Sequence, residues 1–303
     1  MDENIARFGN NDGLIGIVTE PSGKDNHFNN NVAVLILNAG LIHRAGPNLL
    51  FVSLSRIIAQ AGFICLRFDF SGIGDSVTRN TNNKLLSVKE KRSSEIRQAM
   101  DYLEYHKKCR NFIIIGLCNG ADFAFNMCLE EKKVIAACLI NGNFIGYEYL
   151  KTINAFIEQK IRNRFYTKKK FNLSLWTGNL RSLSILSKFK RFFKTRKQLN
   201  RPLHLKDFQE WDIVIKKNMP VLLIYSEGSK TFDVYNLIHK KKLNKAQTDN
   251  IETHIIKNTD HIFTPLWSQN ELVNKIMVWL KGLSVKNTAL YGIALLSVFK
   301  GIN

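Results

Sequence analysis

Two patterns of apolar and polar positions alternate along the 303-residue chain. Continuous apolar runs that end in small or turn-forming residues are typical of strands buried on both faces of a sheet. Runs with helical spacing lie between them. The strands are expected at 14–21, 32–40, the start of 63–76, 111–116, 134–141, 220–228 and 251–263, and the helices at 47–62, 93–108, 120–131 and 268–283. This alternation predicts an α/β fold with a mostly parallel central sheet and helices on both faces.

The alternation is interrupted after about Gly142 and resumes with the apolar run at 220–228. From Lys151 to Lys206 the chain contains 16 Lys or Arg residues and one acidic residue, Glu158, a balance of +15, with aromatic residues interleaved. We therefore expect a basic helical cap or lid insertion. The predicted divisions are a core of 1–144 and 211–283, an insertion at 145–210 and a C-terminal tail at 284–303.

The charge of the whole chain is strongly basic, with 44 Lys plus Arg against 25 Asp plus Glu, or +19. Such a charge favours an anionic membrane surface, acidic substrates or nucleic acid as partners, although a Lys- and Asn-rich composition would produce it as well. Because no base-reading motif is present, nucleic acid is not the expected partner.

Cysteine usage and the chain ends bear on location and cofactors. The chain has five Cys with no close spacing, which argues against a disulfide framework and a zinc site. We expect neither a metal nor another cofactor. The first residues, MDENIARFGN, lack an apolar signal core, and no apolar window reaches the length of a membrane span. The expected location is the cytoplasm, with peripheral membrane contact left open.

The segment NFIIIGLCNGADFAF, at 111–125, places Cys118 between Gly116 and Gly120 where a buried strand meets a helix. Gly-x-Cys-x-Gly in this position predicts the strained turn that presents the nucleophile of an α/β-hydrolase. A Cβ at either glycine would clash in such a turn. The helix N-terminus and a charged histidine both favour thiolate, so we expect a pKa for Cys118 below the ordinary ~8.5. The alternative is a packed structural thiol at an ordinary tight turn.

Chain order predicts the partners of Cys118. In this fold an acid and then a base follow the nucleophile, each just past a later strand. His261, in NTDHIFTP, lies where the base belongs. The acid position falls near Ser229, whose hydroxyl cannot carry the charge that orients an imidazolium. We therefore assign the acid to Asp233, with Glu227 in reserve; a helix N-cap is the alternative role for Asp233.

The predicted oxyanion donors are backbone N–H groups on two loops. One is the N–H of Asn119, directly after the nucleophile, and the other comes from Gly40 or Leu41, in the loop after the strand at 32–40. Small residues in that loop would let it approach the reacting centre.

Three further residues are candidates for substrate binding. His43 and Arg44 follow the predicted oxyanion loop, and Trp176 lies in the insertion. The guanidinium of Arg44 could bind a carboxylate or phosphate of the substrate, or pair with Asp75.

Three motifs together, RFDFSGIGDS, GLCNGA and DHIFTP, resemble the α/β-hydrolase superfamily. The segment LNAGLIHRAGPN, with Cys118 in place of serine, and the Trp-x-Gly region LWTGNLRSL resemble the exosortase-associated hydrolases, which are found among bacterial exopolysaccharide genes. The core resemblance covers about 10–145 and 215–283, and it implies a Cys or Ser hydrolase of unsettled substrate. The chain departs from that subgroup at Ser229, where an acid is typical, and at Leu49, where a second Arg is typical.

Two functional hypotheses follow. The first is a hydrolase or acyl-transfer enzyme that acts on an ester, lactone or thioester of a small-molecule or carrier-linked acyl substrate, with a Cys118–His261–Asp233 triad and a link to exopolysaccharide or cell-envelope metabolism. The second is a noncatalytic accessory protein that binds anionic lipid or polymer through the basic insertion.

Overall fold

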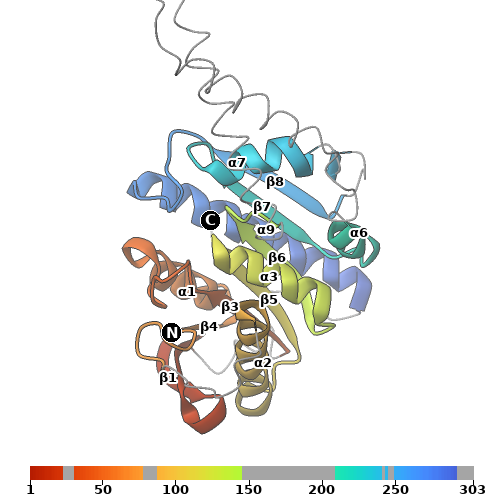
Figure 1. Cartoon of the computed structure of the whole chain (residues 1–303). Helices are drawn as coiled ribbons and strands as arrows, with labels where there is room; N and C mark the ends of the chain where they lie inside the picture. The colour runs from red at the N-terminus through yellow and green to blue at the C-terminus, as the bar shows by residue number, and fades with distance from the viewer. Residues whose placement is uncertain (23–30, 78–86, 145–208, 241–242, 245–248, 292–303) are drawn as a thin grey trace, which may run out of the picture. The chain divides into compact units, whose positions relative to one another are not determined.

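The computed structural model describes residues 1–22, 31–77, 87–144, 209–240, 243–244 and 249–291 (Figure 1). The predicted insertion, including Trp176 and the basic stretch, lies outside these residues except at its C-terminal end. The chain divides into two compact units, one of Met1–Phe144 with Ile213–Asn303 and the other of Ile145–Asp212. The candidate site belongs to the first unit.

In the described residues the strands form one eight-stranded sheet, in the order β1-β2-β4-β3-β5-β6-β7-β8 (Figure 1). Pairs β1–β2 and β2–β4 are antiparallel, and all the later pairs are parallel. The strands are β1 (Asp2–Phe8), β2 (Leu14–Glu20), β3 (Val32–Leu37), β4 (Ile64–Phe68), β5 (Asn111–Leu117), β6 (Val134–Ile140), β7 (Val221–Ser226) and β8 (Ile251–Ile256). The parallel strands end at the same edge of the sheet, which is where sites form in such folds.

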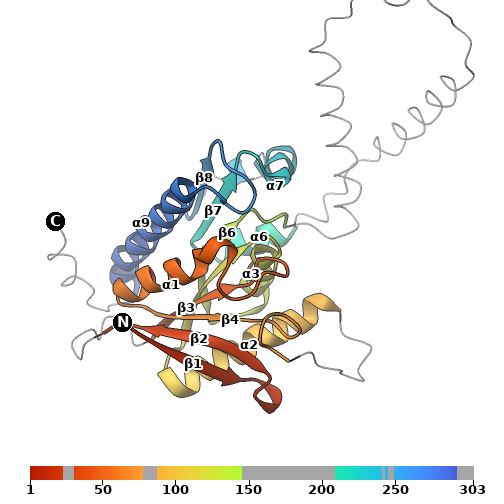
Figure 2. The ribbon, with the colours of Figure 1, turned by 90° about the vertical axis from the view of Figure 1, so that its left-hand side faces the viewer.

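Helices cover both faces of this sheet. Figure 2 shows α1 and α9 together on one side of the sheet, with α2 and α3 on the other. The α-helices of the described residues are α1 (Leu50–Gln60), α2 (Val88–Lys107), α3 (Asn119–Glu130), α6 (Gln209–Lys216), α7 (Lys230–Val234) and α9 (Leu266–Tyr291). Two short 3₁₀ helices, η1 (Asn10–Asp12) and η2 (Pro47–Leu49), and one short π-helix, η5 (Tyr235–His239), accompany them. The predicted α/β fold with a mostly parallel sheet is confirmed.

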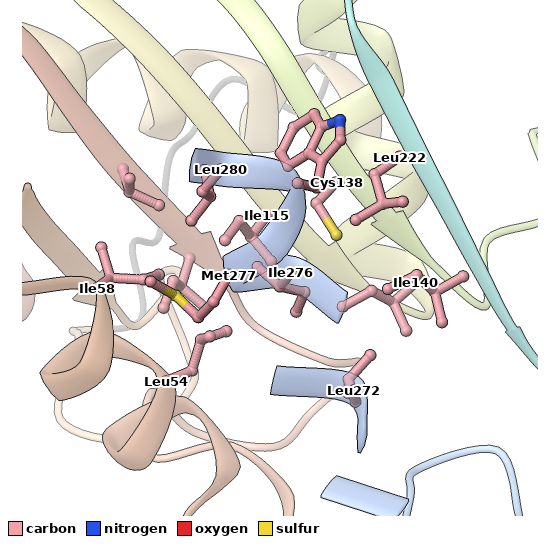
Figure 3. Close-up of a cluster of buried hydrophobic side chains, with 14 of the residues drawn as sticks. Leu54, Ile58, Ile115, Cys138, Ile140, Leu222, Leu272, Ile276, Met277 and Leu280 are labelled. Carbon is pink, nitrogen blue, oxygen red and sulfur yellow. The ribbon is translucent and has the colours of Figure 1, made fainter. Parts of the chain in front are cut away.

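One hydrophobic cluster joins α1 and α9 to the strands they cover (Figure 3). Leu54 and Ile58 come from α1, and Ile276 and Leu280 from α9. Strand side chains belong to the same cluster, among them Ile115 of β5, Ile140 of β6 and Leu222 of β7. Burial of this apolar surface between the sheet and the two helices fixes the strands, and with them the loops at their carboxyl ends.

Several elements differ from the sequence-based expectation. Helix α6 was not among the expected helices, and strand β8 ends at Ile256 rather than at 263. Helix α2 begins at Val88 rather than at residue 93, because Ser87 and Glu90 form a capping box that precedes the predicted start. Helix α9 continues to Tyr291 rather than ending at 283, because one exposed glycine, Gly282, weakens a helix by only about 1 kcal/mol. Strand β1 was not predicted.

Every helix in the described ranges is too short or too polar to cross a membrane.

Candidate active site

Cys118 occupies the turn between β5 and α3 in a strained conformation, with φ 58° and ψ −125°. Non-glycine residues rarely combine a positive φ with such a ψ, and residues held in sparsely populated regions of this kind cluster at active sites. The two flanking glycines are sterically required. A Cβ on Gly116 would lie 2.2 Å from the carbonyl oxygen of Gly120, and a Cβ on Gly120 would lie 2.5 Å from that of Asn38. The geometry of the turn therefore agrees with the motif.

The thiol of Cys118 is half-buried, whereas the other four thiols are fully buried, at Cys65, Cys109, Cys128 and Cys138. Burial raises the pKa of Cys118, and the charge of Asp122 raises it further; the N–H of Asn119 acts in the opposite direction. This direction contradicts the expected low pKa. The helix N-terminus does favour thiolate, but desolvation outweighs it.

His261 lies in the loop after β8. Burial lowers the pKa of its imidazole, and this effect outweighs the charge of Asp260, which raises that pKa. Its backbone is tied to the turn of Cys118 through two consecutive residues at the end of β6. The N–H of Cys118 donates to the carbonyl oxygen of Ile140 (2.9 Å), and Nδ2 of Asn141 donates to the carbonyl oxygen of His261 (2.7 Å). These bonds bring the thiol turn and the histidine loop to one edge of the sheet. Near neutral pH the two groups are an uncharged thiol and an uncharged imidazole.

The partner of the His261 ring is Ser229 rather than an acidic residue. Oγ of Ser229 lies 2.7 Å from Nδ1 of His261, and its residue is buried. Asp233 is exposed on α7, and the carboxylate of Glu227, also exposed, accepts the N–H of Asn258 at 3.3 Å. The expected hydrogen bond from His261 to Asp233, or to Glu227 in reserve, is therefore wrong. Ser229 is the first position after β7 from which a side chain turns back to His261, and it occupies the place that the acid was expected to take.

The two loops that carry the predicted oxyanion donors approach each other at Gly120. The N–H of Asn119 belongs to the first residue of α3, so it has no acceptor within the helix. The contact between Gly120 and Asn38 holds the loop after β3 against this helix end. Gly40 follows with φ +59° and open space beside it, whereas the side chain of Leu41 is 88% exposed. The loop after β3, which carries Gly40 and Leu41, thus lies against the first turn of α3.

Arg44 is engaged within the protein. Its Nη1 pairs with the fully buried carboxylate of Asp69, and its Nη2 lies 2.5 Å from Asp75. Burial works against the charge of Arg44, but the hydrogen bonds to Asp75 and Asp69 outweigh it and raise its pKa. Of the two roles expected for Arg44, pairing with Asp75 is the one observed, with Asp69 as an additional partner. His43 is exposed, and its Nδ1 accepts the N–H of Ala45 at 3.3 Å. Trp176 lies outside the described residues.

Sequence reasoning missed three residues that shape the site. Asn141 joins the ends of β6 and β7 to the His261 loop, Thr231 contacts Ser229, and Asp122 receives the N–H groups of residues 143 and 144. Position was the available signal: Asn141 directly follows a buried strand, and Asp122 lies one helical turn after Cys118. Polar residues at such places point toward the strand ends. In the described ranges, no group of three His, Cys, Asp or Glu side chains is arranged to hold a metal ion.

The sheet order, the strained turn after β5 and the histidine after β8 define an α/β-hydrolase. The BAAT / acyl-CoA thioester hydrolase C-terminal family matches residues 96–268, which is more than half of the chain. The chain belongs to this family. It is therefore a hydrolase of ester or thioester bonds. The matched region contains Cys118, Ser229 and His261.

Solved structures agree with this fold. The chain is similar to an esterase of Pyrococcus furiosus, with a TM-score of 0.57 and 18% identity, over 92% of this chain and 90% of the esterase. It is also similar to a dienelactone hydrolase from Anabaena variabilis, with a TM-score of 0.55 and 12% identity, over 93% and 97% of the two chains. An α/β-hydrolase from a Penicillium species has a TM-score of 0.55 and 14% identity, over 93% and 98%. No curated protein sequence matches the chain.

Proposed function

We propose that the chain hydrolyses acyl esters or thioesters through a covalent acyl-enzyme, with Cys118 as nucleophile and His261 as general base. The observation that carries this proposal is the strained, half-buried thiol at the turn after β5, tied through Ile140 and Asn141 to the histidine loop. A buried structural thiol needs neither a positive φ nor exposure at the strand ends. Four other cysteines of the chain illustrate that ordinary role.

The two uncharged groups suit a mechanism in which the proton moves as the bond forms. Nε2 of His261 takes the thiol proton while Sγ of Cys118 attacks the acyl carbon, and the carbonyl oxygen becomes an oxyanion. The N–H groups of Asn119 and Gly40, or Leu41, receive this oxyanion. The bond to the leaving group then breaks, and the leaving oxygen or sulfur takes the proton from His261.

Water completes the cycle. His261 takes a proton from a water molecule as the water oxygen attacks the acyl carbon of the thioester on Cys118. The S–C bond breaks, the acid leaves, and the proton returns from His261 to the sulfur. The same acyl-enzyme could pass its acyl group to another nucleophile, so hydrolysis and acyl transfer share every step before the water.

The acyl substrate is a small molecule or is linked to a carrier. The family supports thioesters as the first class to test. The resemblance of LNAGLIHRAGPN and LWTGNLRSL to exosortase-associated hydrolases extends the proposal to acyl groups of exopolysaccharide or cell-envelope metabolism, in a cytoplasmic protein.

The proposal is tested by steady-state turnover of an acetyl thioester of N-acetylcysteamine and of p-nitrophenyl acetate. We expect Cys118→Ala and His261→Ala each to lower kcat/KM by at least about a hundredfold. Cys109→Ala, which removes a buried thiol at the end of α2, is the matched control and should change turnover little. Turnover by Cys118→Ala at the wild-type rate would exclude Cys118 as the nucleophile.

The second candidate is binding of an anionic membrane surface by the basic insertion, alone or together with catalysis. The supporting observation is the balance of +15 between Lys151 and Lys206. We expect the full chain to bind phosphatidylserine vesicles at low salt and to lose this binding at physiological salt. Equal binding to neutral phosphatidylcholine vesicles would show that the charge is only compositional.

A further inference from the structure

A chain of hydroxyl groups leads from the His261 ring to the end of β6. Oγ of Ser229 lies 2.7 Å from Nδ1 of His261 and 2.6 Å from Oγ1 of Thr231, and it accepts the N–H of Thr231 at 3.2 Å. Oγ1 of Thr231 in turn donates to Oδ1 of Asn141 at 3.5 Å. Ser229 and Thr231 are buried, at 3% and 5% exposure, so water does not replace these partners freely.

The side-chain amide of Asn141 determines which group donates in its hydrogen bond with Thr231. Its Oδ1 accepts the N–H of Ser226 (2.9 Å) and its Nδ2 donates to the carbonyl oxygen of His261 (2.7 Å), so two backbone groups fix which end of the amide is oxygen. Thr231 can then only donate to Oδ1 of Asn141.

The other hydrogen bonds of these hydroxyl groups follow from what a hydroxyl can donate and accept, since each has one proton and two lone pairs. We assign the proton of Thr231 to Asn141, because Oδ1 of Asn141 can only accept; the short contact between Thr231 and Ser229 is then made by the proton of Ser229. Oγ of Ser229 is then an acceptor toward both the N–H of Thr231 and Nδ1 of His261. The proton of the imidazole therefore lies on Nδ1, and Nε2 keeps its lone pair.

We propose that Ser229 is a positioning residue that, with Thr231 and Asn141, holds His261 in the tautomer with its base nitrogen free, in the place where related sites use a carboxylate. The inference rests on the proposed roles of Cys118 and His261. It assigns the orienting task to a neutral hydroxyl rather than to the acid that the sequence led us to expect.

A neutral partner orients the ring but does not stabilise its charged form. The charged groups of the segments around His261 are Asp260, which precedes it, and Glu227, Lys230 and Asp233, which are exposed on the β7–α7 segment. Among them only Asp260 raises the pKa of His261, and burial outweighs it. The site thus keeps an uncharged thiol–imidazole pair at neutral pH. The imidazole of His261 stays unprotonated, and able to act as a base, to a lower pH than it would beside a carboxylate.

The first test uses the wild-type chain, so it does not depend on the folding of a variant. Two-bond ¹H–¹⁵N spectra report which ring nitrogen of His261 carries the proton, with His261→Gln to assign the signals. We expect the Nδ1–H tautomer above a pKa that lies below the ordinary value of about 6.5. An Nε2–H tautomer, with Ser229 donating to Nδ1, would overturn the inference.

The second test compares variants with p-nitrophenyl acetate. Ser229→Ala should lower kcat about fivefold to tenfold with little change in KM, the factor of one neutral hydrogen bond. Ser229→Asp should recover turnover and shift the acidic limb of the pH–kcat profile upward by about one unit or more. Ser268→Ala is the matched control. The buried hydroxyl of Ser268, on α9, accepts a hydrogen bond from Thr259 at 2.9 Å and not from His261, so turnover should stay within about twofold.

The two levels of the account fail separately. If Cys118→Ala keeps wild-type turnover, the proposed function is wrong. If Cys118→Ala abolishes turnover while Ser229→Ala and Ser229→Asp both match the wild type in kcat and pH profile, the function stands and the positioning role of Ser229 is wrong.

Discussion

Gly120 in the first turn of α3 lies so close to Asn38, just after β3, that a Cβ at residue 120 would be 2.5 Å from the carbonyl oxygen of Asn38. This contact couples the nucleophile turn to the loop that carries Gly40. The obstacle is backbone on a strand end, which cannot rotate away as a side chain could. The second glycine of Gly-x-Cys-x-Gly therefore allows the loop after β3 to lie directly against the first turn of α3.

We expect Gly120→Ala to destabilise the fold by about 1–3 kcal/mol through overpacking. Turnover should fall by about a hundredfold, because displacement of the loop after β3 by about 1 Å would misplace an oxyanion donor. Chemical denaturation and kcat/KM with p-nitrophenyl acetate measure the two effects.

Gly282→Ala is the matched control for that substitution. Gly282 is exposed on α9, and an added Cβ would meet nothing within 4 Å. This variant should keep its activity and gain up to about 1 kcal/mol in stability, since alanine is the better helix former. Unchanged stability and turnover in Gly120→Ala would contradict the steric argument.

The pair of Arg44 with Asp69 should matter for stability more than that of Arg44 with Asp75. Asp69 is fully buried, whereas the side chain of Asp75 is 67% exposed. We expect Arg44→Met to lower the free energy of unfolding by about 3–5 kcal/mol, because it leaves a buried carboxylate without its cation. Asp75→Asn should cost at most about 1 kcal/mol. Urea unfolding measures the free energy of unfolding of the two variants. Equal losses would show that the buried pair with Asp69 contributes no more to stability than the exposed pair with Asp75.

Asp122 should make stability depend on pH. Burial raises its pKa to about 6 even though its Oδ1 accepts the N–H groups of Asn143 and Phe144, both at 2.8 Å. The folded state then binds the proton more tightly than the unfolded state, so the contribution of Asp122 to stability is complete below about pH 4 and is lost as the pH rises through about 6. The shift corresponds to roughly 3 kcal/mol.

Asp122→Asn tests that dependence, since the amide oxygen can accept the same two N–H groups. The variant should lose less stability than the wild type between pH 4 and 7 in urea titrations. It should also react faster with iodoacetamide at Cys118 near pH 7, because the charge of Asp122 raises the pKa of that thiol. A wild-type pH dependence in the variant would mean that another group titrates in this window.

Much of the fold was readable from the sequence because its strands are buried on both faces. The runs that became β3, β5, β6 and β7 are short and almost entirely apolar, which is the pattern of parallel strands buried on both faces. Strand β1, DENIARF, escaped because it lies at the sheet edge with five of its first six residues exposed. Its sequence carries little apolar signal, and only its pairing with β2 makes it a strand.

The site was readable to the extent that chain order determines it. The places of Cys118 and His261 in the fold were predictable because each follows a strand that the sequence reveals. The partner of His261 could not be predicted in this way, because the choice among Glu227, Ser229 and Asp233 depends on where the first turn of α7 directs each side chain. Charge favoured an acid, but the N-cap geometry of Ser229 turns its hydroxyl inward, and Asp233 is exposed on α7. The raised pKa of Cys118 also depends on burial, which local sequence does not report.

The central claim is that Cys118 carries the acyl group during turnover, and rapid-quench mass spectrometry of the intact chain tests it most directly. After mixing with p-nitrophenyl acetate, the wild type should gain one acetyl group within the first turnover, located by peptide mapping on Cys118. The adduct should be removed by hydroxylamine, as expected for a thioester. In Ser229→Ala it should form more slowly, and in Cys118→Ala it should be absent. Hydrolysis at the wild-type rate with no acyl group on Cys118, or with the acyl group on another residue, would contradict the account.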